Sequence, residues 1–249
     1  MLLARTDWDS PKHRGITWFA LPMKQDGVEV RPLQQMNRYA SFNEVFLTEA
    51  RVPHANVVGG VNNGWAVATT TLMFERTMQA ARLAFVPDEA PGRCAQEARA
   101  EAAAYAQTYV WYPQRAGRAD LVLESHSDDP VTRQRIVDVY MRERTMRWTA
   151  MRAAEARRQG KPPGPEGSLA KLAASELARR CAVAHTHLRG AHAMLAGDVI
   201  HEILVSVPAV SIAGGTDEIQ HNIIGERVLG LPKEPSVDTD VPFREVRRN

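Results

Sequence analysis

The sequence has little cysteine and no long uninterrupted apolar run, and each shortage excludes a class of protein. Its two cysteines, Cys94 and Cys181, are too few for a disulfide framework and favour a reducing compartment. No uninterrupted apolar stretch approaches the ~20 residues that cross a bilayer. Residues 1–5 are too short for a signal peptide and are followed at once by charged residues. We therefore expect a cytoplasmic protein without a membrane span.

The sequence also lacks an excess of positive or negative charge. The formal net charge is +2 over 249 residues, with 24% charged and 44% hydrophobic residues, as in an ordinary globular protein of one or two domains. Because no basic excess is present, nucleic-acid binding is not expected. His185 and His187 are two residues apart and would point apart on a helix, so we expect no metal site.

The hydrophobic pattern changes period near residue 60. Short β-branched or aromatic segments, bounded by turn residues, predict strands at 15–22, 28–33 and 44–53, and residues 2–3 are a candidate for one more. From Trp65 onward, apolar residues recur at helical spacing. The fold class is therefore mainly α with a small β part: a partial β-domain at 1–60, an antiparallel helical bundle at 61–235 and a tail at 236–249.

Capping signals predict several helix boundaries. Asp128-Asp129-Pro130 favours the start of a long helix that ends near Arg158, before a linker at 159–167. Ser168 is the predicted cap of the next helix, and Pro208 is predicted to end the helical segment at 198–207.

A pair of glycines precedes the last predicted helix, in the segment AGGTDEIQHNIIGERVLGLPKEP at 213–235. Thr216 is a good N-cap, and Asp217 and Glu218 suit the positive end of the helix dipole. Five apolar residues are predicted to bury one face of this helix: Ile219, Ile223, Ile224, Val228 and Leu229. The backbone of Gly214 and Gly215 is open to close approach, so this segment is either a tight turn or a binding edge for a phosphate, a hydroxyl or a carbonyl oxygen.

This segment closely resembles the C-terminal signature of the acyl-CoA dehydrogenase family, GGT.EIQ.NIIAERVLGLP. The stretches GITWFALPM, NEVFLTEARVPHANVVGGVNNGW, DDPVTRQRI and GPEGSLAKLAASELARR resemble the family in the same order. The resemblance implies a FAD-dependent enzyme that oxidises the Cα–Cβ bond of an acyl-CoA thioester. In that family a carboxylate removes the α proton while the β hydrogen passes as hydride to the flavin.

The resemblance also implies roles for particular residues. The commonest position of the family's base is occupied here by Gly214, whereas a second branch places the base in the first bundle helix before an arginine. Glu75 and Arg76 match that second position, which makes Glu75 the candidate base and Arg76 a substrate-binding residue; the alternative for Glu75 is an exposed helical glutamate. The backbone N–H of Gly214 would face the thioester carbonyl. The residues implied near FAD are Gly215, Thr216, Glu218 and Gln220.

Three departures from the family leave two hypotheses. The Arg-x-Phe-Gly motif that helps to hold the FAD pyrophosphate is absent, with Arg115 and Arg118 as substitutes, and the paired glycines of the next FAD-binding stretch are reduced to Gly190. The N-terminal helical domain and the first half of the β-domain have no counterpart. The chain is therefore either a truncated dehydrogenase that passes electrons to an electron-transferring flavoprotein, or a non-catalytic subunit or remnant that packs with a full-length partner. The resemblance implies a homo- or hetero-oligomer, a tetramer in the family.

Overall fold

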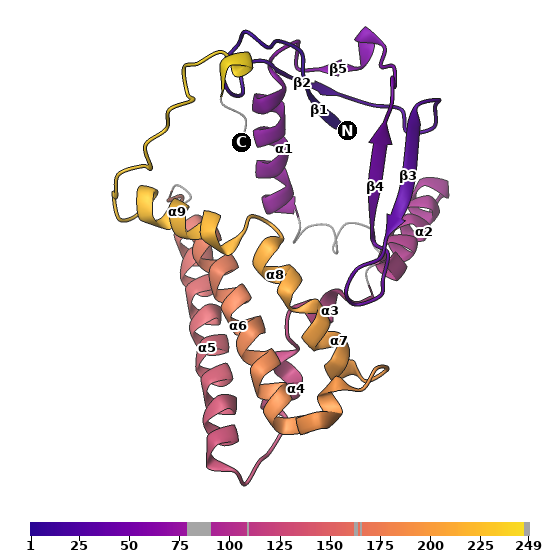
Figure 1. Ribbon diagram of the computed structural model, residues 1–249. Coiled ribbons are helices and arrows are strands. Elements are labelled where there is room, and N and C mark those ends of the chain that lie inside the picture. Colours follow the sequence, from indigo (N-terminus) through magenta and orange to yellow (C-terminus); the bar gives the residue numbers. More distant parts are fainter. Residues whose placement is uncertain (79–90, 109, 162–163, 165, 247–249) are drawn as a thin grey trace. The chain divides into compact units, whose positions relative to one another are not determined.

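The chain forms two compact units (Figure 1). The computed structural model describes residues 1–78, 91–108, 110–161, 164 and 166–246. One unit consists of Met1–Leu33, Ala40–Tyr105 and Glu234–Asn249, and the other of Gln34–Tyr39 and Ala106–Lys233. The fold is mainly helical with small antiparallel sheets, which confirms the predicted fold class.

The first unit contains the strands. Its described elements are β1 (Leu2–Arg5), β2 (Ile16–Phe19), β3 (Val28–Leu33), β4 (Phe42–Leu47), a 3-10 turn η1 (His54–Asn56), β5 (Val57–Val58), α1 (Gly64–Met78), α2 (Arg93–Thr108, which ends in the second unit) and η3 (Phe243–Glu245). The strands make a three-stranded antiparallel sheet in the order β1-β2-β5 and a separate β3–β4 hairpin. The strand expected at 15–22 is shorter, at Ile16–Phe19, and the strand expected at 44–53 lies at Phe42–Leu47. Glu49 has a φ of +56°, which a strand does not adopt, so β4 cannot continue to residue 53.

The C-terminal segment of the first unit lies against its N-terminal loop. The backbone N–H of Arg244 donates to the carbonyl of Trp8 (3.1 Å), and the rings of Trp8 and Phe243 are 5.4 Å apart. The Arg5 guanidinium lies 3.7 Å from the centre of the Phe243 ring. An ion pair between Lys12 Nζ and Asp238 Oδ1 (3.1 Å) adds a polar contact. The segment is therefore docked on the β part.

The second unit is helical. Its described elements are α3 (Tyr112–Arg115), α4 (Ala119–Leu123), α5 (Pro130–Arg158), α6 (Glu166–Arg189), η2 (Gly190–Met194), α7 (Val199–Ser206), α8 (Pro208–Ile212) and α9 (Asp217–Arg227). The long helices α5 and α6 run antiparallel, side by side (Figure 1). One buried cluster joins α4, α5 and α6, and a second joins α6, η2 and α7. Their members are Val122, Val139, Leu177, Cys181 and Ala184 in the first, and Ala178, Ala193, Ile200, Ile203 and Val207 in the second.

The predicted helix boundaries had mixed outcomes. The start of α5 is confirmed, since Asp129 accepts a hydrogen bond from the backbone N–H of Thr132 (2.7 Å) and Pro130 is the first helical residue. The predicted cap Ser168 is wrong, because α6 already begins at Glu166. Pro208 begins the short helix α8 instead of only ending the segment before it, which suits a residue with no N–H to pair.

Residues Val199–Arg227 have the length and mean hydropathy of a candidate membrane span, although polar residues interrupt this stretch. In the structure this stretch is divided into α7, α8 and α9, with 8, 5 and 11 residues. Each helix is shorter than the ~20 residues that span a bilayer.

Gly117 fixes the turn between α3 and α4 against α6. It has a φ of +85°, and a Cβ at this position would lie 2.8 Å from both the Ala178 Cα and the Cys181 Cβ. The Gly117 carbonyl oxygen lies 3.0 Å from Nε2 of the buried His185. Burial lowers the pKa of His185, so the imidazole is neutral and donates to this carbonyl. His185 is thus a packing residue of the helical unit.

We expect Gly117→Ala to destabilise the second unit more than Gly160→Ala. Gly160 has a similar φ of +69°, but a Cβ there would find no atom within 4 Å, so its substitution costs only backbone strain. That strain is about 1 kcal/mol, and overpacking against α6 should bring the Gly117→Ala cost to about 3 kcal/mol. Urea unfolding followed by circular dichroism measures both; equal losses would contradict the close packing of Gly117 on α6.

Candidate functional site

The glycine turn lies between α8 and α9. The Ala213 N–H donates to the Ala209 carbonyl (2.9 Å) at the end of α8, and Gly214 and Gly215 then adopt φ of +67° and +88°. Such backbone angles favour glycine. A Cβ on Gly214 would find no atom within 4 Å, so the exposed backbone of this residue is open to close approach.

Thr216 caps α9, as predicted. Its Oγ1 accepts a hydrogen bond from the Ile219 N–H (3.3 Å). Glu218 is exposed at the same helix start, and hydrogen bonds from its own backbone N–H and from the Thr216 hydroxyl lower the pKa of its carboxyl. A carboxylate therefore already lies at the positive end of the α9 dipole.

The face of α9 that is buried differs from the prediction. Of the five predicted residues, Ile223 and Ile224 are half-buried and Ile219, Val228 and Leu229 are exposed, whereas the polar Asp217 and Gln220 are only 5% and 3% exposed. Gln220 Nε2 lies 3.4 Å from the carbonyl oxygens of both Gly214 and Gly215. The apolar residues were assigned to the core by their helical spacing, but the buried contacts of this helix are polar. The Gln220 amide therefore holds the glycine turn from the inside.

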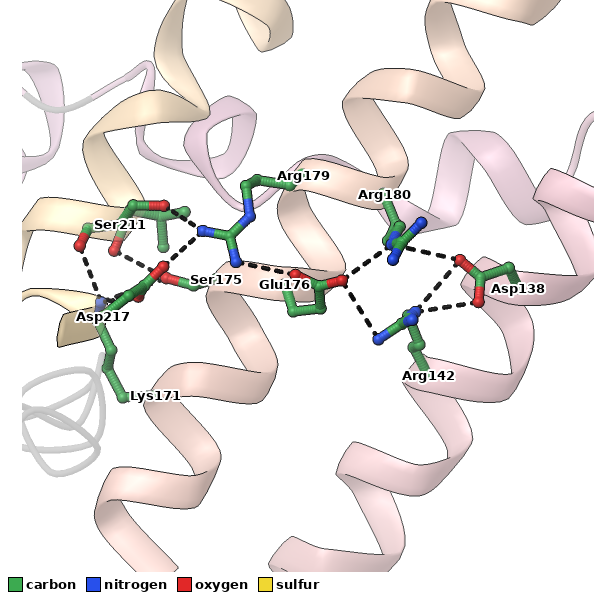
Figure 2. A network of polar contacts seen from close by, with 10 residues as sticks. Asp138, Arg142, Lys171, Ser175, Glu176, Arg179, Arg180, Ser211 and Asp217 are labelled. Carbon is green, nitrogen blue, oxygen red and sulfur yellow. Dashed lines mark hydrogen bonds and ion pairs between the residues drawn. The ribbon is translucent and has the colours of Figure 1, made fainter. Parts of the chain in front are cut away.

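Asp217 is the most strongly held residue of the site (Figure 2). Its Oδ1 lies 2.6 Å from Lys171 Nζ and its Oδ2 lies 2.5 Å from Arg179 Nη1. Burial by itself would raise the pKa of this carboxyl, but hydrogen bonds from Lys171, Arg179 and Ser175 outweigh it and hold the pKa well below its usual range. Asp217 is therefore ionised and neutralised by two cations.

The same cations bind the other side of the turn. Lys171 Nζ donates to the Ser211 carbonyl (3.3 Å), and Arg179 Nη1 donates to Ser211 Oγ (2.7 Å). Ser175 Oγ donates to the Val210 carbonyl (3.1 Å). The end of α8 and the start of α9 are thus both fixed to α6, and the two glycines lie between these anchors.

The network continues from α6 to α5, as Figure 2 shows. Glu176 accepts from Arg179 (2.8 Å) and from Arg180 (2.9 Å), and Arg142 lies 3.0 Å from Asp138 and 3.5 Å from Glu176. These ion pairs are more exposed than those of Asp217, so each one by itself contributes little to the folding stability. They connect the anchor of the turn to the longest helix of the unit.

The partners of Asp217 were missed by the sequence analysis, which gave this residue only a role at the helix dipole. A signal for them exists: Lys171, Ser175 and Arg179 recur every four residues and so form one polar row on α6. Their partner lies on a different helix, and spacing within one helix does not identify it.

The other predicted residues lie elsewhere. Glu75 and Arg76 are in α1 of the first unit, and their side chains lie outside the described part, so their roles stay predictions. The Arg115 guanidinium lies 3.8 Å from the centre of the Tyr112 ring, and Arg118 Nη2 pairs with Asp120 Oδ2 at 2.6 Å. Both proposed substitutes for the missing FAD arginine thus have partners within the chain.

Comparison of the chain with known protein families shows which family it belongs to. Residues 62–229 match the model described as acyl-CoA dehydrogenase, C-terminal domain. The chain belongs to the acyl-CoA dehydrogenase family.

Two relatives from Mycobacterium tuberculosis resemble this acyl-CoA dehydrogenase homologue over most of its length. The acyl-CoA dehydrogenase IpdE1 is 32% identical over 243 residues, which cover 94% of this chain and 55% of IpdE1. The acyl-CoA dehydrogenase FadE34 is 32% identical over 231 residues, which cover 93% of this chain and 29% of FadE34. The chain therefore spans about half of one relative and less than a third of the other.

Solved structures show the same fold. The Tcur3481-Tcur3483 steroid ACAD has a TM-score of 0.66 and 23% identity, covering 94% of this chain and 56% of that one. The ChsE4-ChsE5 complex from Mycobacterium tuberculosis has a TM-score of 0.63 and 22% identity, covering 94% and 57%. At these identities the likeness concerns the fold alone.

Members of this family are flavoproteins, and the glycine turn fits one edge of such a site. The open Gly214 backbone can approach a planar or thioester group closely. Glu218 already brings negative charge to the start of α9, so this edge suits a neutral acceptor, such as a carbonyl or hydroxyl oxygen, better than a pyrophosphate. Among the described residues, no group of three His, Cys, Asp or Glu side chains is arranged to hold a metal ion.

We expect Asp217→Ala to cost about 3 kcal/mol of folding free energy, because it leaves Lys171 and Arg179 without their buried partner. The folded-state pKa of Asp217 is lowered, so its stabilisation is present above the unfolded pKa of about 4 and is lost as the pH falls through the folded value. The variant should therefore lose less stability than the wild type between neutral and acidic pH.

Urea unfolding at several pH values checks this expectation, with Asp128→Ala as the control. The Asp128 side chain is fully exposed beside His126, and its loss should change stability by less than about 0.5 kcal/mol. Parallel acid profiles for the wild type and Asp217→Ala would show that the buried pairs do not stabilise the unit.

Proposed function

We propose that this chain carries part of a FAD-dependent site that oxidises the Cα–Cβ bond of an acyl-CoA thioester. The observation that carries the proposal is the open Gly214–Gly215 backbone between two anchored helix ends. In this proposal the Gly214 N–H donates to the thioester carbonyl and so stabilises the negative charge that develops when the α proton leaves. Gly215, Thr216, Glu218 and Gln220 border the FAD.

Glu75 is the proposed base and Arg76 a proposed substrate-binding residue. A carboxylate at this position takes the α proton of the acyl chain, and a pKa raised toward neutral pH by apolar surroundings would suit that task. FAD, when bound, supplies the two-electron oxidation. The electrons would pass on to an electron-transferring flavoprotein in the cytoplasm.

A second function is favoured by two arginines of the chain. Arg118 and Arg115, the candidate substitutes for the FAD-binding arginine of the family, are engaged within the chain. Two structures of the same fold bear paired names, Tcur3481-Tcur3483 and ChsE4-ChsE5. In the alternative proposal, the chain is a non-catalytic subunit or remnant that packs with a full-length acyl-CoA dehydrogenase in a homo- or hetero-oligomer.

The visible absorption spectrum of the purified chain separates the two functions. We expect a flavin band near ~450 nm that one of a panel of acyl-CoA thioesters bleaches. Glu75→Gln should keep the band and abolish the bleaching, because an amide cannot accept the α proton, whereas Glu155→Gln, on the exposed end of α5, should behave like the wild type. A colourless protein would exclude the stand-alone enzyme and favour the partner role, to be tested by co-expression with a full-length homologue.

The glycine turn has its own test. Gly214 and Gly230 have nearly equal φ, +67° and +68°, and a Cβ on either would find no atom within 4 Å. Gly214→Ala and Gly230→Ala should therefore lose similar stability, about 1 kcal/mol each. Only Gly214→Ala should weaken flavin retention or raise the thioester concentration needed for bleaching. Equal flavin content and equal titration curves in the two variants would rule out this turn as a binding edge.

A further inference from the structure

The loop Gln34–Tyr39 connects β3 to β4, yet it belongs to the helical unit, whereas both strands belong to the first unit. Its two ends are joined, since the Gln35 N–H donates to the Tyr39 carbonyl (2.8 Å). Asn37 Oδ1 accepts from the Tyr39 N–H (3.2 Å), and Arg38 has a φ of +67°, which residues other than glycine adopt rarely. The loop therefore has one specific conformation that its contacts must hold.

Two side chains of the loop bind one face of α7. Asn37 is 9% exposed, and its Nδ2 donates to Oγ of Ser206 (3.2 Å), which is 1% exposed. The Tyr39 hydroxyl donates to Glu202 Oε1 (3.3 Å). Glu202 and Ser206 are four residues apart and so are neighbours on the helix surface. Because breaking a bond between buried polar groups leaves them without compensation for their lost hydration, the Asn37–Ser206 contact fixes the loop on α7.

The helix α7 is also held by α3 and α6. Gln114 Nε2 of α3 donates to Glu202 Oε2 (3.2 Å). Ile203 and Val207 are buried in one apolar cluster with Ala178 of α6. Apolar contacts thus hold α7 against α6, and polar contacts hold it against α3 and the loop.

The end of α7 is linked to the glycine turn by a short helical path. Ser206 is the last residue of α7, and α8 begins two residues later. The Val210 N–H donates to the Val207 carbonyl across this junction (3.0 Å), and α8 then leads into Gly214. A displacement of α7 would therefore be passed on to the turn.

We propose that the loop Gln34–Tyr39 positions the glycine turn through α7, with Asn37 and Tyr39 as its positioning residues. Lys171 and Arg179 fix the turn from α6, and the loop fixes the helical segment that leads into it. An oxyanion-stabilising N–H has to lie about 3 Å from the oxygen that it stabilises, so small displacements of the turn matter. The hold on α7 depends only on contacts within the helical unit, whereas the effect on a thioester rests on the proposed function.

Amide hydrogen exchange of the purified chain tests the hold on α7. Asn37→Ala leaves the buried Ser206 hydroxyl without this partner, so we expect exchange to accelerate at least about tenfold at three amides along the path to the turn, those of Val207, Val210 and Ala213. Asn56→Ala is the matched control, because it removes a similar bond to the Ala20 carbonyl (2.9 Å) in the first unit. It should leave the exchange of these three amides unchanged.

A double variant shows whether the bond itself is responsible. Ser206→Ala removes the acceptor of the Asn37 amide, so the combined variant should exchange no faster at the three amides than the faster of the two single variants. Additive acceleration would show that Asn37 and Ser206 act separately.

Tyr39→Phe keeps the test decisive if Asn37→Ala does not fold, since it removes only the hydroxyl that binds Glu202. We expect faster exchange at the same three amides, by a smaller factor because Tyr39 is less buried than Asn37. Tyr140→Phe, on an exposed position of α5, is its control. Circular dichroism shows whether each variant remains folded.

Bleaching of the flavin band by an acyl-CoA thioester tests the consequence for the proposed site. Asn37→Ala and Tyr39→Phe should raise the thioester concentration for half-bleaching about tenfold, because the Gly214 N–H is misplaced. Asn56→Ala and Tyr140→Phe should match the wild type. A colourless wild-type chain would contradict the stand-alone enzyme, whereas the exchange rates would still decide whether the loop holds α7.

Two results would overturn the proposal. Unchanged exchange at the three amides in both Asn37→Ala and Tyr39→Phe would show that α7 keeps its position without the loop. Equal acceleration at every amide of the helical unit, including those of α5, would show a contribution to overall stability and no specific positioning of the turn.

Discussion

The ionised carboxyl of Asp217 is the contact on which the rest of the candidate site depends. A buried carboxylate is unfavourable unless charged partners and hydrogen bonds compensate for its lost hydration. Lys171 and Arg179 supply that compensation from α6, and the same two side chains bind Ser211 at the end of α8. Two helix ends are thereby fixed, and the glycines between them need no side-chain contact of their own. The two-glycine turn thus has a defined position, although glycine itself restricts the backbone little.

The proposed chemistry follows from this division of tasks. Gln220 contacts the turn from the buried side, and the Gly214 backbone stays open on the other side. Glu218 makes the helix start more suitable for a neutral oxygen than for a phosphate. The family assignment supplies the reaction class, and the geometry of the turn supplies the reason that a carbonyl would fit there.

Local signals in the sequence predicted several helix starts, whereas contacts between distant segments could not be predicted from such signals. Thr216 was identified as a cap and the segment 128–130 as a helix start, because such signals depend only on the next few residues. The partners of Asp217 lie on another helix, 46 and 38 residues away, and could not be inferred from spacing within α9. Ile219, Val228 and Leu229 were assigned to the core by their helical period but are exposed, because the most buried residues of α9 are the polar Asp217 and Gln220. Strand positions were found, but their division into two sheets depends on pairing, which composition does not determine.

The docked segment around Phe243 has a consequence for the order in which the chain folds. Lys12 and Asp238 are 226 residues apart in sequence, yet their side chains are in contact. A ribosome completes every helix of the second unit before it reaches Asp238. The helices of the second unit are therefore made before the segment that docks on the β part, and the β part must wait for a segment made long after its own strands. During that interval the strands remain incompletely covered, and chaperones would have their main opportunity to bind.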